Sequence, residues 1–159
     1  MSAMDKPIYQ FTFLRHGESV GNAQSRWQSE AMKFDLVIAS PLGRAKETAQ
    51  IIASALNVKV ELDPIWLERH IGEMEGLTAE EVRQKPQPPY VTPYNSIGGN
   101  GEGDWELYLR AGKALHELLH RPPGSYLVVS HGGMLNQLMH AIVGIAHQPD
   151  PSGVRFHFE

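Results

Sequence analysis

Short apolar segments that each end in a polar motif constrain the fold of this 159-residue chain more than any other feature. Residues 8–14, 35–39 and 126–129 are the three apolar segments, and they are followed by Arg15-His16, Ser40-Pro41 and Ser130-His131, respectively. The carboxyl ends of parallel strands lie along one edge of a sheet and form its ligand crevice. The pattern therefore predicts that these three motifs meet in one site.

The segments between these runs carry the periodicity of helices and further strands. Residues 43–56 place apolar side chains at spacings of three and four, which predicts an amphipathic helix. The other predicted elements are a strand at 58–62, a Thr78-capped helix at 78–84, a helix at 104–120 and a last edge or antiparallel strand at 154–158. This order predicts an α/β fold, a three-layer α/β/α sandwich with a mostly parallel central sheet, as a single domain over residues 1–159.

Composition narrows the classes of partner. The net charge of −4 and the isoelectric point near 6.0 disfavour nucleic acid and anionic membranes, because both reward a basic surface. The absence of cysteine excludes disulfides, thiolate zinc sites and cysteine nucleophiles. No apolar run approaches the length of a membrane span, so we expect a cytoplasmic protein that acts on a small molecule.

The motifs also indicate a chemistry. Arg15, His16 and Gly17 bring a guanidinium, an imidazole and a glycine to a strand end, as expected for a phosphate site with histidine chemistry. Arg44 falls in the first turn of a predicted helix, where free amides also bind anions. A glycine-punctuated loop at 67–76 supplies carboxylates.

Four blocks of the chain resemble the histidine phosphatase superfamily, in family order, between about residues 11 and 143. They are Arg15-His16-Gly17-Glu18, the segment 40–49, the loop 67–76 and Ser130-His131-Gly132-Gly133. The resemblance implies that His16 is the phosphorylated nucleophile, that Arg15, Arg44 and His131 hold the phosphoryl oxygens beside Gly132, and that Glu68 is the general acid. Asn22 is either a further phosphate contact or a turn former beside Gly21.

Several other residues are weaker candidates for the site. Glu73 and Glu75 are alternative carboxylates near Glu68, and His70, Glu102 and Trp105 are further candidates to line the pocket. The remaining histidines, His116, His120, His140, His147 and His157, are expected to have no partners at metal-ligand spacing. Two arginines supply the positive charge that phosphate needs, so we expect neither a metal nor a cofactor.

One interval departs from the family pattern. Family members usually carry a Leu-Thr-x-x-Gly segment and a long helix before the Ser-Pro block, whereas only eleven residues separate Asn22 from Phe34 here. We therefore expect one family helix to be missing after Ser25. Such a loss would leave an exposed apolar patch or a partner in its place.

The sequence favours a metal-independent phosphatase that hydrolyses a small phosphomonoester through a phosphohistidine. One alternative is a cofactor-dependent phosphoglycerate mutase, suggested by Glu68-Arg69-His70 and Gly72. The mutases carry an insertion with basic residues, whereas Arg83 and Lys85 are the only cations between Leu77 and Trp105, which favours hydrolysis. The sequence also allows a protein phosphohistidine phosphatase or a catalytically silent phosphate-binding domain, and it leaves the oligomeric state open.

Overall fold

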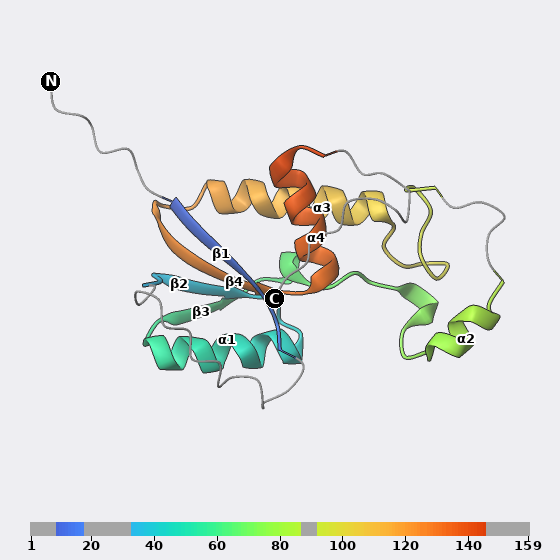
Figure 1. Ribbon diagram of the computed structural model, residues 1–159, viewed down its shortest axis with the longest axis horizontal. Helices are drawn as coiled ribbons and strands as arrows, with labels where there is room; N and C mark the ends of the chain where they lie inside the picture. The colour runs from blue at the N-terminus through green and yellow to red at the C-terminus, as the bar shows by residue number, and fades with distance from the viewer. Residues whose placement is uncertain (1–8, 18–32, 87–91, 146–159) are drawn as a thin grey trace, which may run out of the picture.

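The computed structural model describes residues 9–17, 33–86 and 92–145. Its centre is a parallel four-stranded sheet, shown in Figure 1, in the order β1-β4-β2-β3. The strands are β1 (Tyr9–Arg15), β4 (Gly124–Ser130), β2 (Leu36–Ala39) and β3 (Lys59–Leu62). The last strand in the sequence thus lies between the first two.

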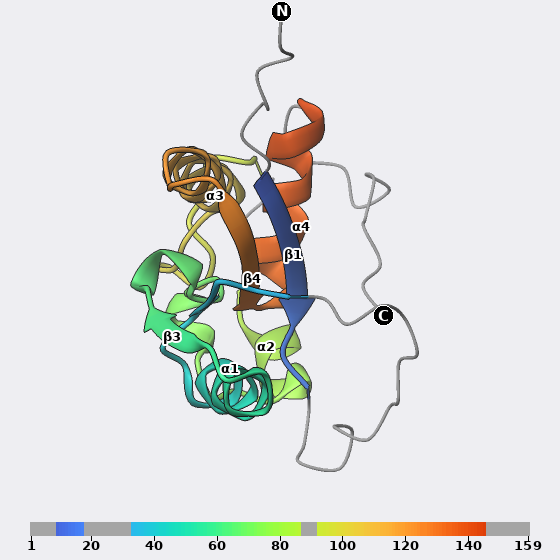
Figure 2. The same cartoon turned by 90° about the vertical axis from the view of Figure 1, so that its left-hand side faces the viewer.

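Helices cover both faces of this sheet. They are α1 (Gly43–Leu56), α3 (Asp104–Leu119) and α4 (Gly132–Val143). The short helix α2 (Ala79–Gln84), which buries none of its residues, lies apart from the sheet (Figure 1), and the 3-10 turns are η2 (Pro64–Trp66) and η3 (Gly72–Met74). Figures 1 and 2 show α1 on one face of the sheet and α3 with α4 on the other. The predicted three-layer α/β/α architecture is confirmed.

The two cores differ in the size of their side chains. Three alanines of α1, Ala45, Ala49 and Ala53, are buried against Val37 and Val129 of the sheet. Their small side chains let α1 lie close to the strands. The opposite core contains Trp66 and the leucines of α3 and α4, so larger side chains fill the space beneath these two helices.

The predicted elements agree with the structure in type, with small differences in bounds. The helix α1 has the predicted limits, and Thr78 caps α2 in a capping box with Glu81. β4 extends beyond the predicted 126–129 at both ends because all of its residues pair with β1. The predicted strand at 154–158 and the break after Ser25 lie outside the described residues.

The register of the sheet brings three strand ends together. Arg15, the last residue of β1, pairs with Ser130, the last residue of β4. Beyond the strands, the His16 amide donates to the Ser130 carbonyl over 3.1 Å, and the Ser40 amide donates to Val129 over 3.0 Å. The three polar motifs of the sequence therefore leave the sheet side by side, as predicted.

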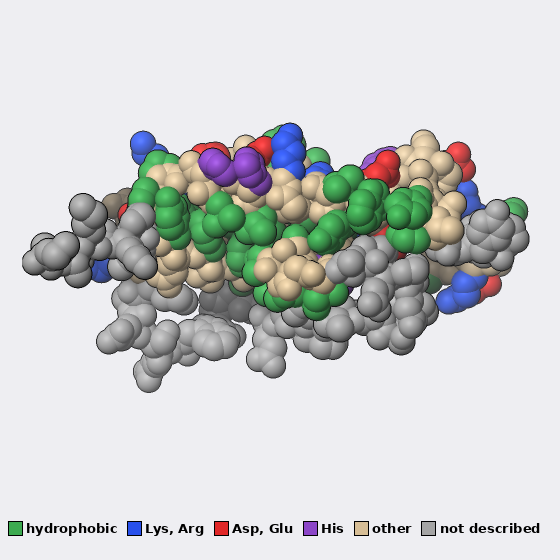
Figure 3. Space-filling model, turned by 90° about the horizontal axis from the view of Figure 1, so that it is seen from above, with side chains coloured by type: hydrophobic (Ala, Val, Ile, Leu, Met, Phe, Trp, Pro, Cys, Tyr) green, Lys and Arg blue, Asp and Glu red, His purple; other side chains and the backbone are tan. Residues whose placement is uncertain are grey.

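Apolar side chains are also exposed on the α3–α4 side of the molecule (Figure 3). They are Trp105, Leu109, Leu119, Ile142 and Val143. These residues lie on helices, so they do not correspond to the bare sheet face that a missing helix would leave. Within the described ranges no helix is both long and apolar enough to cross a membrane.

Candidate active site

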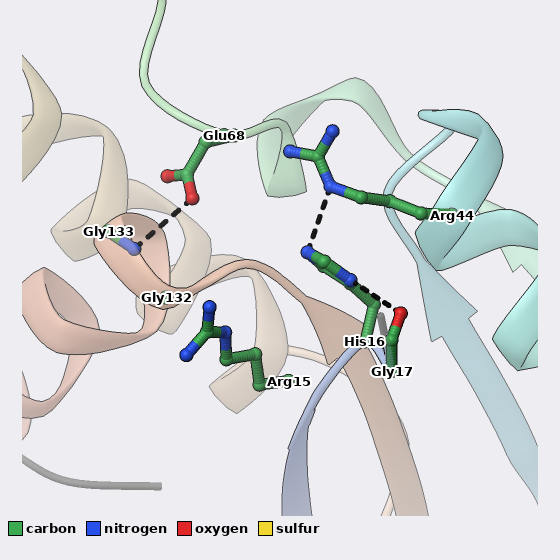
Figure 4. A pocket seen from close by; sticks show the side chains of 7 residues that line it. All are labelled: Arg15, His16, Gly17, Arg44, Glu68, Gly132 and Gly133. Atoms are coloured by element: carbon green, nitrogen blue, oxygen red, sulfur yellow. Dashed lines mark hydrogen bonds between the residues drawn. The ribbon is translucent and has the colours of Figure 1, made fainter. Parts of the chain in front are cut away.

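A cavity of about 480 Å³ opens at the carboxyl ends of β1 and β4 (Figure 4). Its lining consists of Arg15, His16, Gly17, Arg44, Glu68, Gly132 and Gly133. These residues come from the end of β1, the first turn of α1, the loop after η2 and the first turn of α4. The convergence expected from the separate sequence blocks is thus present in the fold.

Two hydrogen bonds orient the His16 imidazole. The Nε of Arg44 lies 2.8 Å from Nε2 of His16, and Nδ1 of His16 lies 3.1 Å from the carbonyl oxygen of Gly17. An arginine can only donate, so Nε2 must accept through its lone pair, and the ring hydrogen is at Nδ1, where it bonds to Gly17. In this arrangement Nε2 directs its lone pair toward the Arg44 guanidinium (Figure 4).

Two guanidinium groups give the cavity its positive charge. Arg44 reaches His16 from the start of α1, and Arg15 lies on the side of Gly132 (Figure 4). A Cβ on Gly132 would lie 3.6 Å from Nε of Arg15, so the helix start packs directly against this side chain. Two fixed charges that can each bind two oxygens equip this cavity for an oxyanion, as a phosphoryl site would require.

Glu68 faces the arginines from the opposite wall (Figure 4). One carboxylate oxygen accepts the backbone amide of Arg69 at 2.9 Å, and the other accepts that of Gly133 at 3.3 Å. Gly133 belongs to the first turn of α4, where the helix dipole favours a negative charge. Of the three carboxylates considered from the sequence, Glu68 lines the cavity, whereas Glu73 lies 3.8 Å from Lys85.

His131 lies behind the cavity rather than in its lining. It is fully buried, its Nε2 is 2.8 Å from Oγ of Ser40, and its ring centroid is 4.9 Å from that of His16. Burial, followed by the charge of Arg44, lowers the pKa of His131 to about 4. His131 is therefore neutral at pH 7, and its Nδ1 has no hydrogen-bond partner within the described ranges.

The other candidates from the sequence stand away from the cavity. Glu102 pairs with Arg110, Trp105 stacks on Tyr108, and His70 is exposed. Asn22 lies outside the described residues. Sequence reasoning gave no role to Ser40, although it stands in the Ser-Pro block, and none to Arg110, for which no local pattern exists.

One expectation about the histidines is wrong. His116 and His120 were expected to have no histidine partner at metal-ligand spacing, yet their ring centroids lie 4.0 Å apart on adjacent turns of α3. Residues four apart share one side of a helix, which accounts for the contact. In the part of the chain that the structure describes, no group of three or more side chains could hold a metal ion.

Comparison with known proteins assigns the family. The model of the histidine phosphatase superfamily, branch 1, matches residues 28–151. The chain belongs to this superfamily. Among its relatives, "Probable phosphoglycerate mutase GpmB" of Yersinia enterocolitica is 32% identical and aligns with 87% of this chain and 76% of its own length.

Solved structures of the superfamily share the fold. YhfR of Bacillus stearothermophilus superposes with a TM-score of 0.67 at 27% identity, over 84% of this chain and 79% of its own. The alpha-ribazole phosphatase of Shigella flexneri gives the same TM-score at 24% identity, over 86% and 80% of the two chains. The phosphoglycerate mutase-like fold is therefore shown, and membership of the superfamily supports a phosphatase or mutase type of activity.

The alignment with the Yersinia protein also shows a difference in length. It spans 165 positions, which is more than the whole chain of 159 residues, although only 87% of the chain takes part. Within the aligned region this chain therefore lacks residues that its relative has. The sequence predicted such a loss near Ser25, a place that lies outside the described residues.

Proposed function

We propose that this histidine phosphatase hydrolyses small phosphomonoesters without a metal, through a phosphohistidine at His16. The observation that carries the proposal is the lone pair of His16 Nε2, fixed within hydrogen-bond distance of Arg44 in a cavity that Arg15 and Glu68 also line. A protonated imidazole could not attack phosphorus, so the neutral tautomer is the reactive form.

The first step transfers the phosphoryl group to His16. The Arg44 guanidinium occupies the place that phosphorus would take, so it exchanges its bond to Nε2 for bonds to the phosphoryl oxygens. Arg15 binds the same oxygens from the opposite side, and the buried His131, whose ring centroid lies 4.9 Å from that of His16, supports the nucleophile from behind the cavity. Nε2 then forms a bond to phosphorus as the bond to the leaving oxygen breaks, and the donors stabilise the charge that spreads over the transferred group.

Glu68 donates a proton in the first step and accepts one in the second. In its protonated form it gives a proton to the leaving alkoxide. As a carboxylate it then takes a proton from water, which attacks the phosphohistidine and releases inorganic phosphate and free His16. Its bonds to the Arg69 and Gly133 amides hold the carboxylate on the wall opposite Arg44.

Charge pairing favours hydrolysis over a mutase reaction. A mutase needs free cations to hold the carboxylate of its substrate. The five cations between Glu68 and Lys113 each have a carboxylate partner, in the pairs Arg69–Asp104, Arg83–Glu80, Lys85–Glu73, Arg110–Glu102 and Lys113–Glu117. The net charge of −4 likewise supports a small substrate over nucleic acid or an anionic membrane, and we propose a cytoplasmic location.

Detection of the covalent intermediate is the direct test of the proposed mechanism. Quenching the protein with a ³²P-labelled phosphomonoester is expected to leave an acid-labile, base-stable label that is absent from His16→Ala. Incubation with 3-phosphoglycerate and 2,3-bisphosphoglycerate then separates the activities, because a phosphatase releases phosphate and a mutase forms 2-phosphoglycerate. Phosphate binding without a label or turnover would instead indicate a silent binding domain.

The role of Glu68 is tested by varying the leaving group. An alkoxide needs a proton in the transition state, whereas p-nitrophenolate leaves unassisted. General acid catalysis contributes about 10²- to 10⁴-fold, so Glu68→Gln is expected to lose that much on an alkyl phosphate and far less on p-nitrophenyl phosphate in single-turnover assays of the first step. Equal losses on both substrates would contradict the assignment.

A further inference from the structure

The backbone carbonyls of four consecutive residues, 65 to 68, each accept a hydrogen bond from a side chain outside the loop. Nη1 of Arg110 donates to Ile65 and to Leu67, each over 2.8 Å, and its Nη2 donates to Glu68 over 3.4 Å. Oγ of Ser130 donates to Trp66 over 2.8 Å. One arginine therefore binds three of the four carbonyls.

The guanidinium that makes these bonds is itself held by Glu102. The two carboxylate oxygens of Glu102 accept Nε and Nη2 of Arg110 at 2.7 and 2.6 Å. The pair is largely removed from solvent, with 22% of the Arg110 side chain and 16% of the Glu102 side chain exposed. Such a two-pronged contact fixes the plane of the guanidinium as well as its place.

Glu102 also connects to the loop through its backbone. Its amide donates to the carbonyl of His70 over 2.7 Å, and Arg69 forms an ion pair with Asp104 at the start of α3. The segment from Glu102 to Arg110 thus contacts the loop both before and after Glu68. By contrast, the Glu68 carboxylate itself bonds only to two backbone amides among the described residues, so the loop backbone decides where it lies.

We propose that Arg110, oriented by Glu102, is a positioning residue that holds Glu68 in place for proton transfer to the leaving group. This inference rests on the proposed function, in which Glu68 is the general acid. Neither Arg110 nor Glu102 lines the cavity, so we assign them no direct contact with the reacting atoms. A displacement of about 1 Å can cost about 10²-fold in rate, and release of three carbonyls would permit such a displacement.

Arg110→Met tests the proposal, because it keeps an unbranched side chain and removes all five donors. In single-turnover assays we expect a 10- to 100-fold loss on an alkyl phosphate and a loss below threefold on p-nitrophenyl phosphate. The KM for p-nitrophenyl phosphate should stay unchanged. Arg110→Lys keeps the charge but cannot reach three carbonyls, and it should lose an intermediate amount on the alkyl substrate only.

Two controls separate positioning from general damage. Lys113→Met removes another ion-paired cation from α3, one whose partner Glu117 is on the same helix, and it should behave as the wild type on both substrates. In a Glu68→Gln background, Arg110→Met should cause no further loss on the alkyl phosphate, because its effect acts through the missing acid. Circular dichroism and thermal melting establish that each variant is folded.

The outcomes distinguish this inference from the proposed function. Equal losses of Arg110→Met on both substrates, additive losses in the Glu68→Gln background, or wild-type rates would each overturn the positioning role. If Arg110→Met does not fold, Glu102→Gln decides by the same criteria. If instead the loss of activity in Glu68→Gln does not depend on the leaving group, the general-acid role of Glu68 in the proposed function is refuted, independently of the results for Arg110.

Discussion

Gly133→Ala is the change that isolates the Glu68 carboxylate most cleanly. A Cβ at position 133 would lie 2.5 Å from Oε1 of Glu68 and 3.3 Å from its Cδ. These atoms are the end of a flexible side chain, so the carboxylate would swing away while the backbone of α4 stays in place. The displaced carboxylate would also lose its 3.3 Å contact with the Gly133 amide.

Stability and activity should then change in opposite directions. Alanine in place of glycine within a helix stabilises by about 0.5–1 kcal/mol, because the unfolded chain has less freedom to lose. The displaced acid should lower the rate on an alkyl phosphate by about 10²-fold, with little effect on p-nitrophenyl phosphate. Thermal melting and single-turnover assays on the two substrates measure both effects.

Gly112→Ala in α3 is the matched control for this change. A Cβ at position 112 would have open space around it, so no group has to move. Because Gly112 does not line the cavity, this variant should share the gain in stability and keep the activity on both substrates. A Gly133→Ala variant that hydrolyses the alkyl phosphate as fast as Gly112→Ala would refute the assigned place of Glu68.

Three further predictions concern the arginine, the buried histidine and metals. Arg44→Lys keeps the charge but loses the two-pronged grip, so kcat/KM should fall at least tenfold, or about 1.4 kcal/mol; unaltered kinetics would argue for charge alone. The pKa of His131 is 6.5 in the unfolded chain and about 4 in the folded protein. Between these two pH values the unfolded chain therefore binds more protons than the folded protein, so the free energy of unfolding decreases as the pH falls from 6.5 to about 4. Urea unfolding should show about 2 kcal/mol less stability at pH 5 than at pH 7 from this group, a difference that shrinks in His131→Gln. Chelators should leave turnover unchanged, and loss of activity that a divalent ion restores would reject the metal-independent mechanism.

Local patterns predicted the elements that depend on neighbouring residues. The capping box of Thr78 and Glu81 and the alanine spacing of α1 are set within a few positions of the chain, and both appear as expected. The cavity residues were also found, because strand ends in a parallel sheet converge whatever lies between them. Assignment of roles to them stays a prediction that the experiments above test.

Contacts between residues far apart in the sequence could not be predicted from local patterns. Arg110 binds carbonyls more than forty positions earlier, at Ile65 and Leu67, and a carbonyl carries no signature in the sequence. Glu102 was considered for the pocket, yet the packing of α3 turns it toward Arg110 instead. The His116–His120 pair was overlooked even though its spacing of four is local, because no third ligand drew attention to it.

The place of β1 in the sheet has a consequence for the order of folding during synthesis. In the described sheet β1 pairs with β4 alone, and the register joins Arg15 to Ser130 across most of the chain. The ribosome releases His16 early. The last quarter of the sequence must be synthesised before His16 can contact β4, before Ser40 can contact His131, and before the first turn of α4 can form. Such distant pairing is slow to form, because a long loop must close first. A nascent chain would thus carry His16 without the cavity around it until β4 has emerged.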